Sequence, residues 1–260
     1  MDFAYTIAGL IVGFIVGLTG VGGGSLMTPI LMLVFNISPA VAVGTDLLYA
    51  CITKSGGIFV YHARRTIEWK VVGLLSLGSI PATLISIMAL KHLGTSGINY
   101  DELITTTLSI ALILTSLVLI FKNQLRFADP EKQSASLQLL HRRFHKPATV
   151  IAGIIIGVLV SLSSVGAGAL GAAFLFFLYP NLRTANIVGT DLAHAVPLTA
   201  IAGLGHMHLG TVDFLLLISL LSGSLPGIYL GSHAGLKLPD KVLRPLLASM
   251  LLLIGLRMAI

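Results

Sequence analysis

Three charged side chains lie inside long apolar segments of this chain: Asp46, Lys54 and Asp191. A charge near the centre of a membrane costs about 2.5–3.5 kcal/mol on insertion scales, so each needs a partner, a wet cavity or a function. Lys54 follows Asp46 by eight residues, a rise of about 12 Å along a helix, which is too far for a direct pair. His194 lies three residues after Asp191, so these two share a helix face and could exchange a proton.

Burial away from water disfavours the charged form of each of these groups. We therefore interpret Asp46, Asp191 and His194 as candidates for carrying or gating protons. The alternative is that the two aspartates accept hydrogen bonds from nearby backbone amides and only hold their helices in register.

Two glycine-rich segments interrupt apolar runs at Gly22–Gly24 and at Gly166-Ala167-Gly168. Glycine in a helix interior is about 1 kcal/mol less favourable than alanine, so both segments predict irregular backbone. Exposed peptide groups cannot face lipid and must face protein or a wet cavity. A helix that resumes at Ser25 would present free N–H groups and a positive dipole end, which suit an anion. Close packing of helices through small residues is the alternative explanation.

The chain also repeats itself, which places these residues in pairs. The segment Val43–Leu47 recurs as Val188–Leu192, and Gly78–Pro81 recurs as Gly223–Pro226. Many transporters build a substrate site at mid-membrane from two such interrupted helices.

The paired positions suggest roles for single residues. We expect Thr45 and Thr190 to offer hydroxyl donors to an anion, Lys54 to supply positive charge, and Pro81 and Pro226 to kink matching helices. The halves differ in charge, because Tyr49 stands where the second half has His194, and Thr199 stands where the first half has Lys54.

Composition indicates an all-α, polytopic membrane protein. Hydrophobic residues make up 55% of the chain and charged residues 10%, against roughly a quarter charged in soluble domains. The net charge of +6 does not indicate nucleic-acid binding, because the basic residues cluster in loops between apolar spans. Cys51 is the only cysteine, which excludes an intramolecular disulfide, and no metal or cofactor site is expected.

Eight spans are predicted, at about 5–34, 39–61, 70–91, 101–122, 147–179, 184–206, 211–233 and 240–260. They form two four-span repeats, residues 1–122 and 147–260, each with a broken first helix, joined by a cytoplasmic linker at 123–146. Basic loops at 62–70 and 122–146 place both termini in the cytoplasm and make the halves run in the same direction. If the glycine breaks are re-entrant hairpins instead of kinks, the count per half changes and the repeats become inverted.

The stretch Gly20–Leu26 with Pro29, followed by Ala42–Leu47, resembles the TauE/SafE sulfite exporter family, also called the toluene-sulfonate uptake permease group. Thr53-Lys54 and the following Gly56-Gly57 are similar to one branch of it. The likeness covers almost the whole chain. It implies transport of sulfite, sulfonates or related organic anions across the bacterial inner membrane. Many members carry a small residue where this chain has Asp46.

The sequence therefore predicts a secondary transporter of a small oxyanion, with the lipid bilayer and the anion as partners and oligomeric state open. Export is the expected direction, because an inside-negative potential drives an anion outward by ~2.3 kcal/mol per charge per 100 mV. Export can therefore be passive, whereas uptake needs coupling, for which protons are the candidate. No P-loop for ATP binding occurs in the sequence. Two alternatives stay open: an anion channel, and a membrane hydrolase that uses Ser163 or Ser164 with His194.

Overall fold

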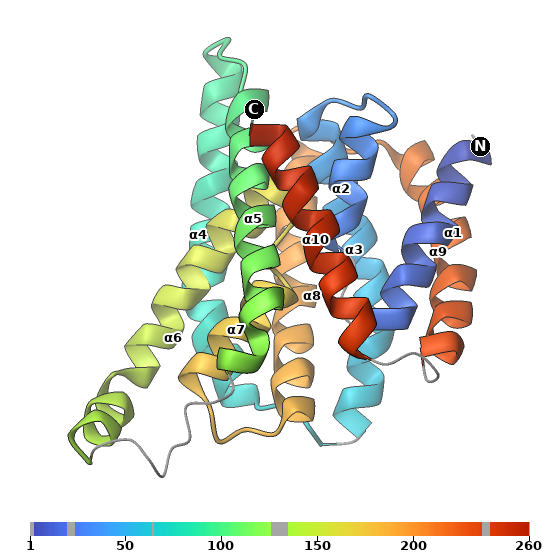
Figure 1. The fold of residues 1–260 in the computed structure, drawn as a ribbon. Coiled ribbons are helices and arrows are strands. Elements are labelled where there is room, and N and C mark those ends of the chain that lie inside the picture. The colour runs from blue at the N-terminus through green and yellow to red at the C-terminus, as the bar shows by residue number, and fades with distance from the viewer. Residues whose placement is uncertain (1–2, 20–23, 64, 126–134, 236–239, 260) are drawn as a thin grey trace.

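The computed structural model describes residues 3–19, 24–63, 65–125, 135–235 and 240–259. Their regular elements are ten α-helices (Figure 1). The first half contains α1 (Phe3–Thr19), α2 (Gly24–Leu33), α3 (Pro39–Ala63), α4 (Trp69–Thr95) and α5 (Asp101–Leu125). The second half contains α6 (Ala135–Ser163), α7 (Ala169–Leu178), α8 (Thr184–His208), α9 (Phe214–Gly235) and α10 (Asp240–Ala259).

Most helices begin where the sequence predicts a start. Pro39 is the first residue of α3, a position where its missing N–H loses no helical hydrogen bond. Asp101 and Glu102 occupy the first turn of α5, where acidic side chains stabilise the positive helix end.

Several helices are long and apolar enough to cross a membrane. Five such segments occur among the described residues: Trp69–Thr95, Asp101–Phe121, His145–Ser163, Thr184–His208 and Phe214–Gly231. Shorter apolar helices accompany them at Phe3–Leu18, Ala169–Leu178 and Leu247–Ala259. The protein is therefore a multi-pass membrane protein, while the predicted number of eight spans is not confirmed.

The two segments with glycine breaks are helical hairpins, and neither is a single kinked span. At the open end of the second hairpin, the hydroxyl groups of Thr149 and Tyr179 lie 2.9 Å apart. At the open end of the first, the rings of Tyr5 and Phe35 pack with centroids 4.9 Å apart. The chain thus enters and returns at one end in each hairpin, which corrects the interpretation of 5–34 and 147–179 as crossings.

The hairpins open toward opposite faces of the protein, as Figure 1 shows for α1–α2 and α6–α7. We call the face where α1 begins and α10 ends the terminal face, and the face where α5 ends and α6 begins the linker face. Both chain ends lie at the terminal face, whereas the α3–α4 connection lies at the linker face. The prediction that the termini share a side with the basic loops is therefore wrong, because it counted each hairpin as one crossing.

The direction of the halves follows from α3 and α8, which occupy equivalent places in them. Gly44, early in α3, packs on His206 near the end of α8 and on Thr211 just after it, whereas Gly203 packs on Leu48. The two helices are therefore antiparallel. The halves run in opposite directions, so the prediction of halves that run in the same direction is corrected.

Glycines let two helix pairs approach closely. A Cβ atom on Gly13 of α1 would meet the main-chain carbonyl of Ser224 on α9. A Cβ atom on Gly157 of α6 would meet the carbonyl of Ser79 on α4 in the same way. Small residues permit this kind of backbone contact between membrane helices, and the two contacts hold each hairpin against a long helix of the other half.

Candidate functional site

The turn of the second hairpin has irregular backbone where the sequence predicts it. Ser164, Gly166 and Gly168 have φ angles of 56°, 121° and 140° between the end of α6 and the start of α7. Positive φ is accessible to glycine at little cost. This explains why Gly166 and Gly168 can turn the chain back inside the protein.

This turn carries main-chain donors. In the described part of the chain, the N–H groups of Ala167, Gly168 and Ala169 make no hydrogen bond. They lie at the N-terminal end of α7, where the helix dipole adds partial positive charge. Such an arrangement can bind an anion.

Lys54 of α3 reaches this turn. Its side chain is 6% exposed, and its ammonium group donates a hydrogen bond of 2.6 Å to the carbonyl oxygen of Ala167. The same charge lies close enough to act electrostatically on Asp191, Asp46 and His194. The structure thus brings together the four ionisable residues that the sequence singled out.

Asp46 of α3 contacts both hairpins. It is fully buried, and Thr28 of α2 donates a hydrogen bond of 2.5 Å to its Oδ2 atom. Ser164, in the second hairpin turn, lies near the same carboxyl group. Among the described residues, Oδ1 of Asp46 and the Ser164 hydroxyl make no hydrogen bond. A buried group without its hydrogen bond costs about 1–3 kcal/mol, so a ligand or proton there would be favourable.

Asp191 and His194 of α8 also lie near Lys54. The carboxyl group of Asp191 packs directly on Gly171 of α7, where a Cβ atom would overlap it. Nε2 of His194 lies 2.8 Å from the Ser79 hydroxyl of α4. Among the described residues Nδ1 of His194 makes no hydrogen bond, so the structure does not join His194 to Asp191 through that atom.

Thr45 and Thr190 join the two halves. The hydroxyl oxygen of Thr45 accepts a hydrogen bond of 3.1 Å from the Asp213 amide, directly before α9. That of Thr190 accepts one of 3.0 Å from the Glu68 amide, directly before α4. Each threonine thus holds the start of a helix in the opposite half.

The remaining predicted residues are placed as follows. Gly22 and Gly23 lie outside the described residues, while Gly24 and Ser25 are the first residues of α2. Pro81 lies inside α4 and Pro226 inside α9, and both helices continue through them.

His206 lies in the last turn of α8. It is fully buried, with Nδ1 2.9 Å from the Thr211 hydroxyl and Nε2 2.9 Å from the Ser161 carbonyl. The histidine thus ties the end of α8 to α6, and its burial is tolerable because both ring nitrogens have a hydrogen-bond partner within reach.

The hydrolase alternative needs His194 to contact Ser163 or Ser164, and the structure does not pair His194 with either serine. His194 contacts the hydroxyl of Ser79, whereas Ser163 donates to the carbonyl of Leu159 at 2.6 Å. A serine nucleophile needs a base within hydrogen-bond reach, and neither Ser163 nor Ser164 has one in the described residues.

Sequence reasoning missed Thr28, Ser79 and Tyr49 as parts of this site. Ser79 lies in the repeated Gly-Ser-x-Pro segment, so the repeat itself could have pointed to it. Tyr49 is 1% exposed and lies near Asp46 and Ser224. Thr28 had no signal of its own, because nothing in sequence tells which threonine of a short helix will face an aspartate.

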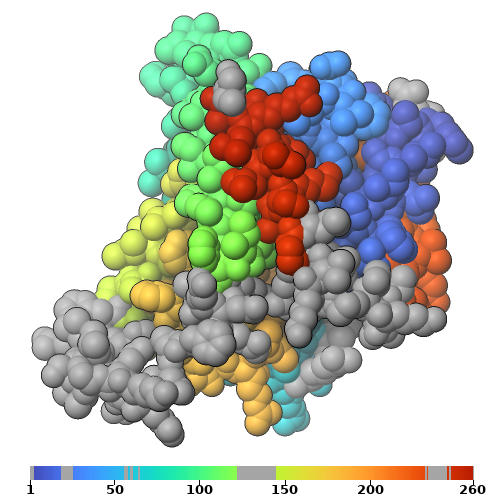
Figure 2. All heavy atoms as spheres, viewed as in Figure 1, coloured from blue at the N-terminus to red at the C-terminus, as the bar shows by residue number. Residues whose placement is uncertain are grey.

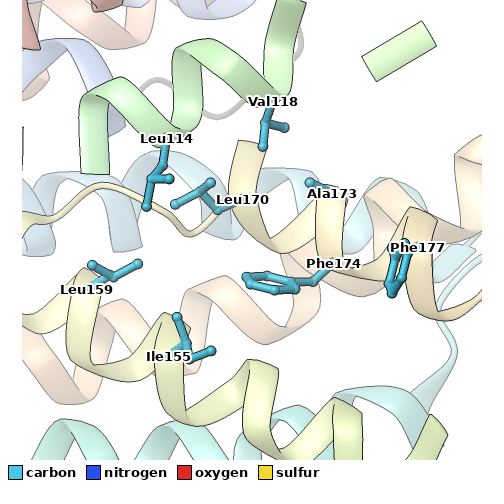
Figure 3. Close-up of a pocket in the computed structure, with 8 residues that line it drawn as sticks. All are labelled: Leu114, Val118, Ile155, Leu159, Leu170, Ala173, Phe174 and Phe177. Carbon is cyan, nitrogen blue, oxygen red and sulfur yellow. The ribbon is translucent and has the colours of Figure 1, made fainter. Parts of the chain in front are cut away.

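The cluster is closed to the outside in this structure. Asp46, Lys54, Asp191 and His194 are at most 6% exposed. Atoms of α5 and α10 lie side by side near the centre of the face shown in Figure 2. A separate, wholly apolar pocket lies between α5, α6 and α7 (Figure 3), and its lining contains no member of the cluster.

The amino-acid sequence of this chain matches a known protein family. The model of the family described as sulfite exporter TauE/SafE matches residues 5–258. The chain belongs to the TauE/SafE family. It is 36% identical to the probable membrane transporter protein YjnA of Bacillus subtilis, over 99% of this chain and all of that protein. It is 29% identical to YdhB, another probable membrane transporter of that organism, over 94% of this chain and 96% of that protein. No solved structure matches.

Membership in the TauE/SafE family bears on the role of the buried cluster of Asp46, Lys54, Asp191 and His194. Family and relatives are described as transporters, so the protein is a membrane transporter and not an enzyme. The buried charged groups between the hairpins are therefore candidates for contacts with a transported solute.

Proposed function

We propose that this protein is a secondary transporter that moves small sulfur-containing oxyanions, such as sulfite or a sulfonate, across the bacterial inner membrane. The observation that carries the proposal is the hydrogen bond from Lys54 to Ala167. It brings the buried cation of the cluster to the turn with free amide donors. Charge and directed donors at one buried point are what an oxyanion requires.

The anion would bind at the turn of the second hairpin. Its oxygens would accept hydrogen bonds from the amides of Ala167, Gly168 and Ala169, and Lys54 would turn from the Ala167 carbonyl toward the anion. The N-terminal end of α2, at Gly24 and Ser25, would complete the site from the other side. In this proposal Thr45 and Thr190 hold the frame and do not contact the anion.

The two aspartates would couple the anion to protons. An anion beside the carboxylates of Asp46 and Asp191 would be repelled unless those groups take up protons. Proton uptake would therefore accompany anion binding, with His194 as a third proton carrier.

The halves would act as an inverted repeat around this site, a design known from transporters with discontinuous helices. We propose that the linker face is cytoplasmic, because Arg65, Lys70, Lys146 and Arg183 lie in its segments. Both termini would then lie outside. The hydrogen bonds of Thr45 and Thr190 would close the terminal and linker faces, one of them opening at a time.

Flux measurements in liposomes test the proposal. Purified protein is reconstituted in vesicles loaded with radiolabelled sulfite, and efflux is followed with and without a pH gradient. We expect saturable flux that unlabelled sulfite accelerates from the far side, a rate that depends on the gradient, and loss of flux in Lys54→Met. Taurine and thiosulfate serve as competitors.

Two results would contradict the proposal. Ohmic single-channel currents without counterflow would favour the channel alternative, which uses the same donors without alternating access. Sulfite flux that equals that of empty vesicles, with intact and folded protein, would remove sulfur oxyanions from the substrate class.

A further inference from the structure

The apolar pocket between α5, α6 and α7 is separate from the cluster of charged residues. Four side chains of α7 line it: Leu170, Ala173, Phe174 and Phe177 (Figure 3). Two residues each from α5 and α6 complete the lining, and all eight are apolar. Its volume of about 340 Å³ lies in the range of ligand pockets, roughly 300–1,000 Å³. Because it offers no polar group, it cannot be a further anion site.

The pocket opens toward the membrane. Three residues at its edge are strongly exposed: Leu114 at 41%, Ile155 at 42% and Phe177 at 65%. Leu170, deeper in the pocket, is 5% exposed. The edge residues Leu114 and Ile155 lie within candidate membrane spans. In a bilayer these side chains contact hydrocarbon, so lipid tails have direct access to the pocket.

The open end of the hairpin carries positive charge. Phe177 lies two residues before Tyr179, whose ring packs edge-on against His145 with centroids 5.8 Å apart. The next residue, Lys146, is exposed, and so is Arg183, four residues after Tyr179. A lipid whose tail enters beside Phe177 would therefore place its headgroup near two cations, which attract anionic lipids.

We propose that this pocket binds one acyl chain of an anionic phospholipid, with the lipid phosphate near Lys146 and Arg183. The tail would support α7 from its outer side. The neighbouring side of α7 carries Gly171, against which Asp191 packs. The lipid thus becomes part of the wall that positions the second hairpin next to the charged cluster.

Native mass spectrometry of the whole protein, released from vesicles of phosphatidylglycerol and phosphatidylcholine, tests this. Wild type is expected to retain one phosphatidylglycerol molecule. In Ala173→Phe the added ring fills the pocket, and retention is expected to fall at least tenfold. Leu77→Phe is the matched control, because Leu77 is 66% exposed on α4 and does not line the pocket. Lys146→Gln with Arg183→Gln is expected to abolish the preference for phosphatidylglycerol while one lipid stays bound.

A fluorescence measurement keeps the proposal testable if Ala173→Phe does not fold. Trp69 is the only tryptophan, so Phe177→Trp in a Trp69→Phe background places one reporter at the pocket edge. We expect phosphatidylglycerol with brominated acyl chains to quench this reporter at lower mole fraction than brominated phosphatidylcholine does.

Three outcomes would overturn the proposal. They are full lipid retention by a folded Ala173→Phe variant, equal quenching by both brominated lipids, and a lipid-free wild-type dimer that Ala173→Phe dissociates. The last would assign the pocket to a second copy of the chain.

Discussion

The two halves of this transporter share a frame but differ in the residues at its centre. The frame is matched contact by contact. Thr45 accepts a hydrogen bond from Asp213, and Thr190, its counterpart, accepts one from Glu68. The close contact of Gly13 with Ser224 likewise has its counterpart in Gly157 with Ser79.

The central residues are not matched. Lys54 crosses to the second hairpin, whereas Thr199 in the equivalent place donates to the carbonyl of Ala195 on its own helix. His194 contacts Ser79 at 2.8 Å, whereas Tyr49, its counterpart, has no hydrogen bond to its hydroxyl among the described residues. We propose that duplication supplied the scaffold and that later divergence made one asymmetric site. The following predictions test this division.

The largest difference is expected between Lys54→Met and Thr199→Val. A hydrogen bond to a charged group is worth about 1.5–3 kcal/mol, so Lys54→Met should weaken anion binding roughly 10- to 100-fold. Thr199→Val should leave flux near the wild-type rate, because its hydroxyl serves only its own helix. Sulfite efflux from liposomes measures both, and equal losses in the two variants would show that the halves contribute alike.

Substitutions at the two close glycine contacts should lower the stability of the protein by similar amounts. Gly13→Ala and Gly157→Ala each force a methyl group onto a neighbouring main chain, an overpacking that costs about 1–3 kcal/mol. Thermal unfolding in detergent should show similar losses for both. Gly73→Ala is the control, because a Cβ atom there meets nothing within 4 Å. A loss at only one of the two contacts would contradict the matched frame.

Asp46 and Asp191 have different neighbours, but we expect both to couple anion transport to protons. Asp46→Asn and Asp191→Asn each remove a group that can take up a proton, so sulfite flux should become insensitive to a pH gradient. Thr28→Val removes only the hydrogen bond to Asp46, worth about 1 kcal/mol, and should weaken coupling without abolishing it. Glu102→Gln, at an exposed helix start, is the control. Full gradient dependence in both asparagine variants would rule out these carboxylates as proton carriers.

The smallest effects are expected for Thr45→Val and Thr190→Val, which each remove one hydrogen bond worth about 0.5–1.5 kcal/mol. The two substitutions should make Cys51 more accessible from opposite sides of the membrane, because the two hydrogen bonds lie at opposite faces of the protein. Cys51, the only cysteine, lies near Lys54 and Thr199 and can report access. A membrane-impermeant maleimide should label it faster from the terminal face in Thr45→Val and from the linker face in Thr190→Val. Unchanged labelling in both would remove the threonines from gating.

Much of the fold was predictable from the sequence because local signals marked it. The apolar runs, the proline at the start of α3 and the glycines at Gly166 and Gly168 each act within a few residues. They therefore predicted helix bounds and the second break well.

The direction of the halves was not predictable in this way. A helix that bends and one that returns have the same composition, and the difference lies in tertiary contacts such as Thr149 with Tyr179. The same limit applies to the site. Charge inside an apolar run revealed Asp46, Lys54 and Asp191, whereas Thr28 and Ser79 became visible only when the helices were packed.

The central claim, that the two hairpins enter from opposite faces, can be tested by labelling from one side of the membrane. Ser38 follows the first hairpin and Asn181 the second, and both are exposed. Ser38→Cys and Asn181→Cys are made separately in a Cys51→Ser background and treated with an impermeant maleimide in sealed vesicles of known orientation. The inverted arrangement predicts that the two cysteines react from opposite sides. Reaction of both from the same side would contradict it.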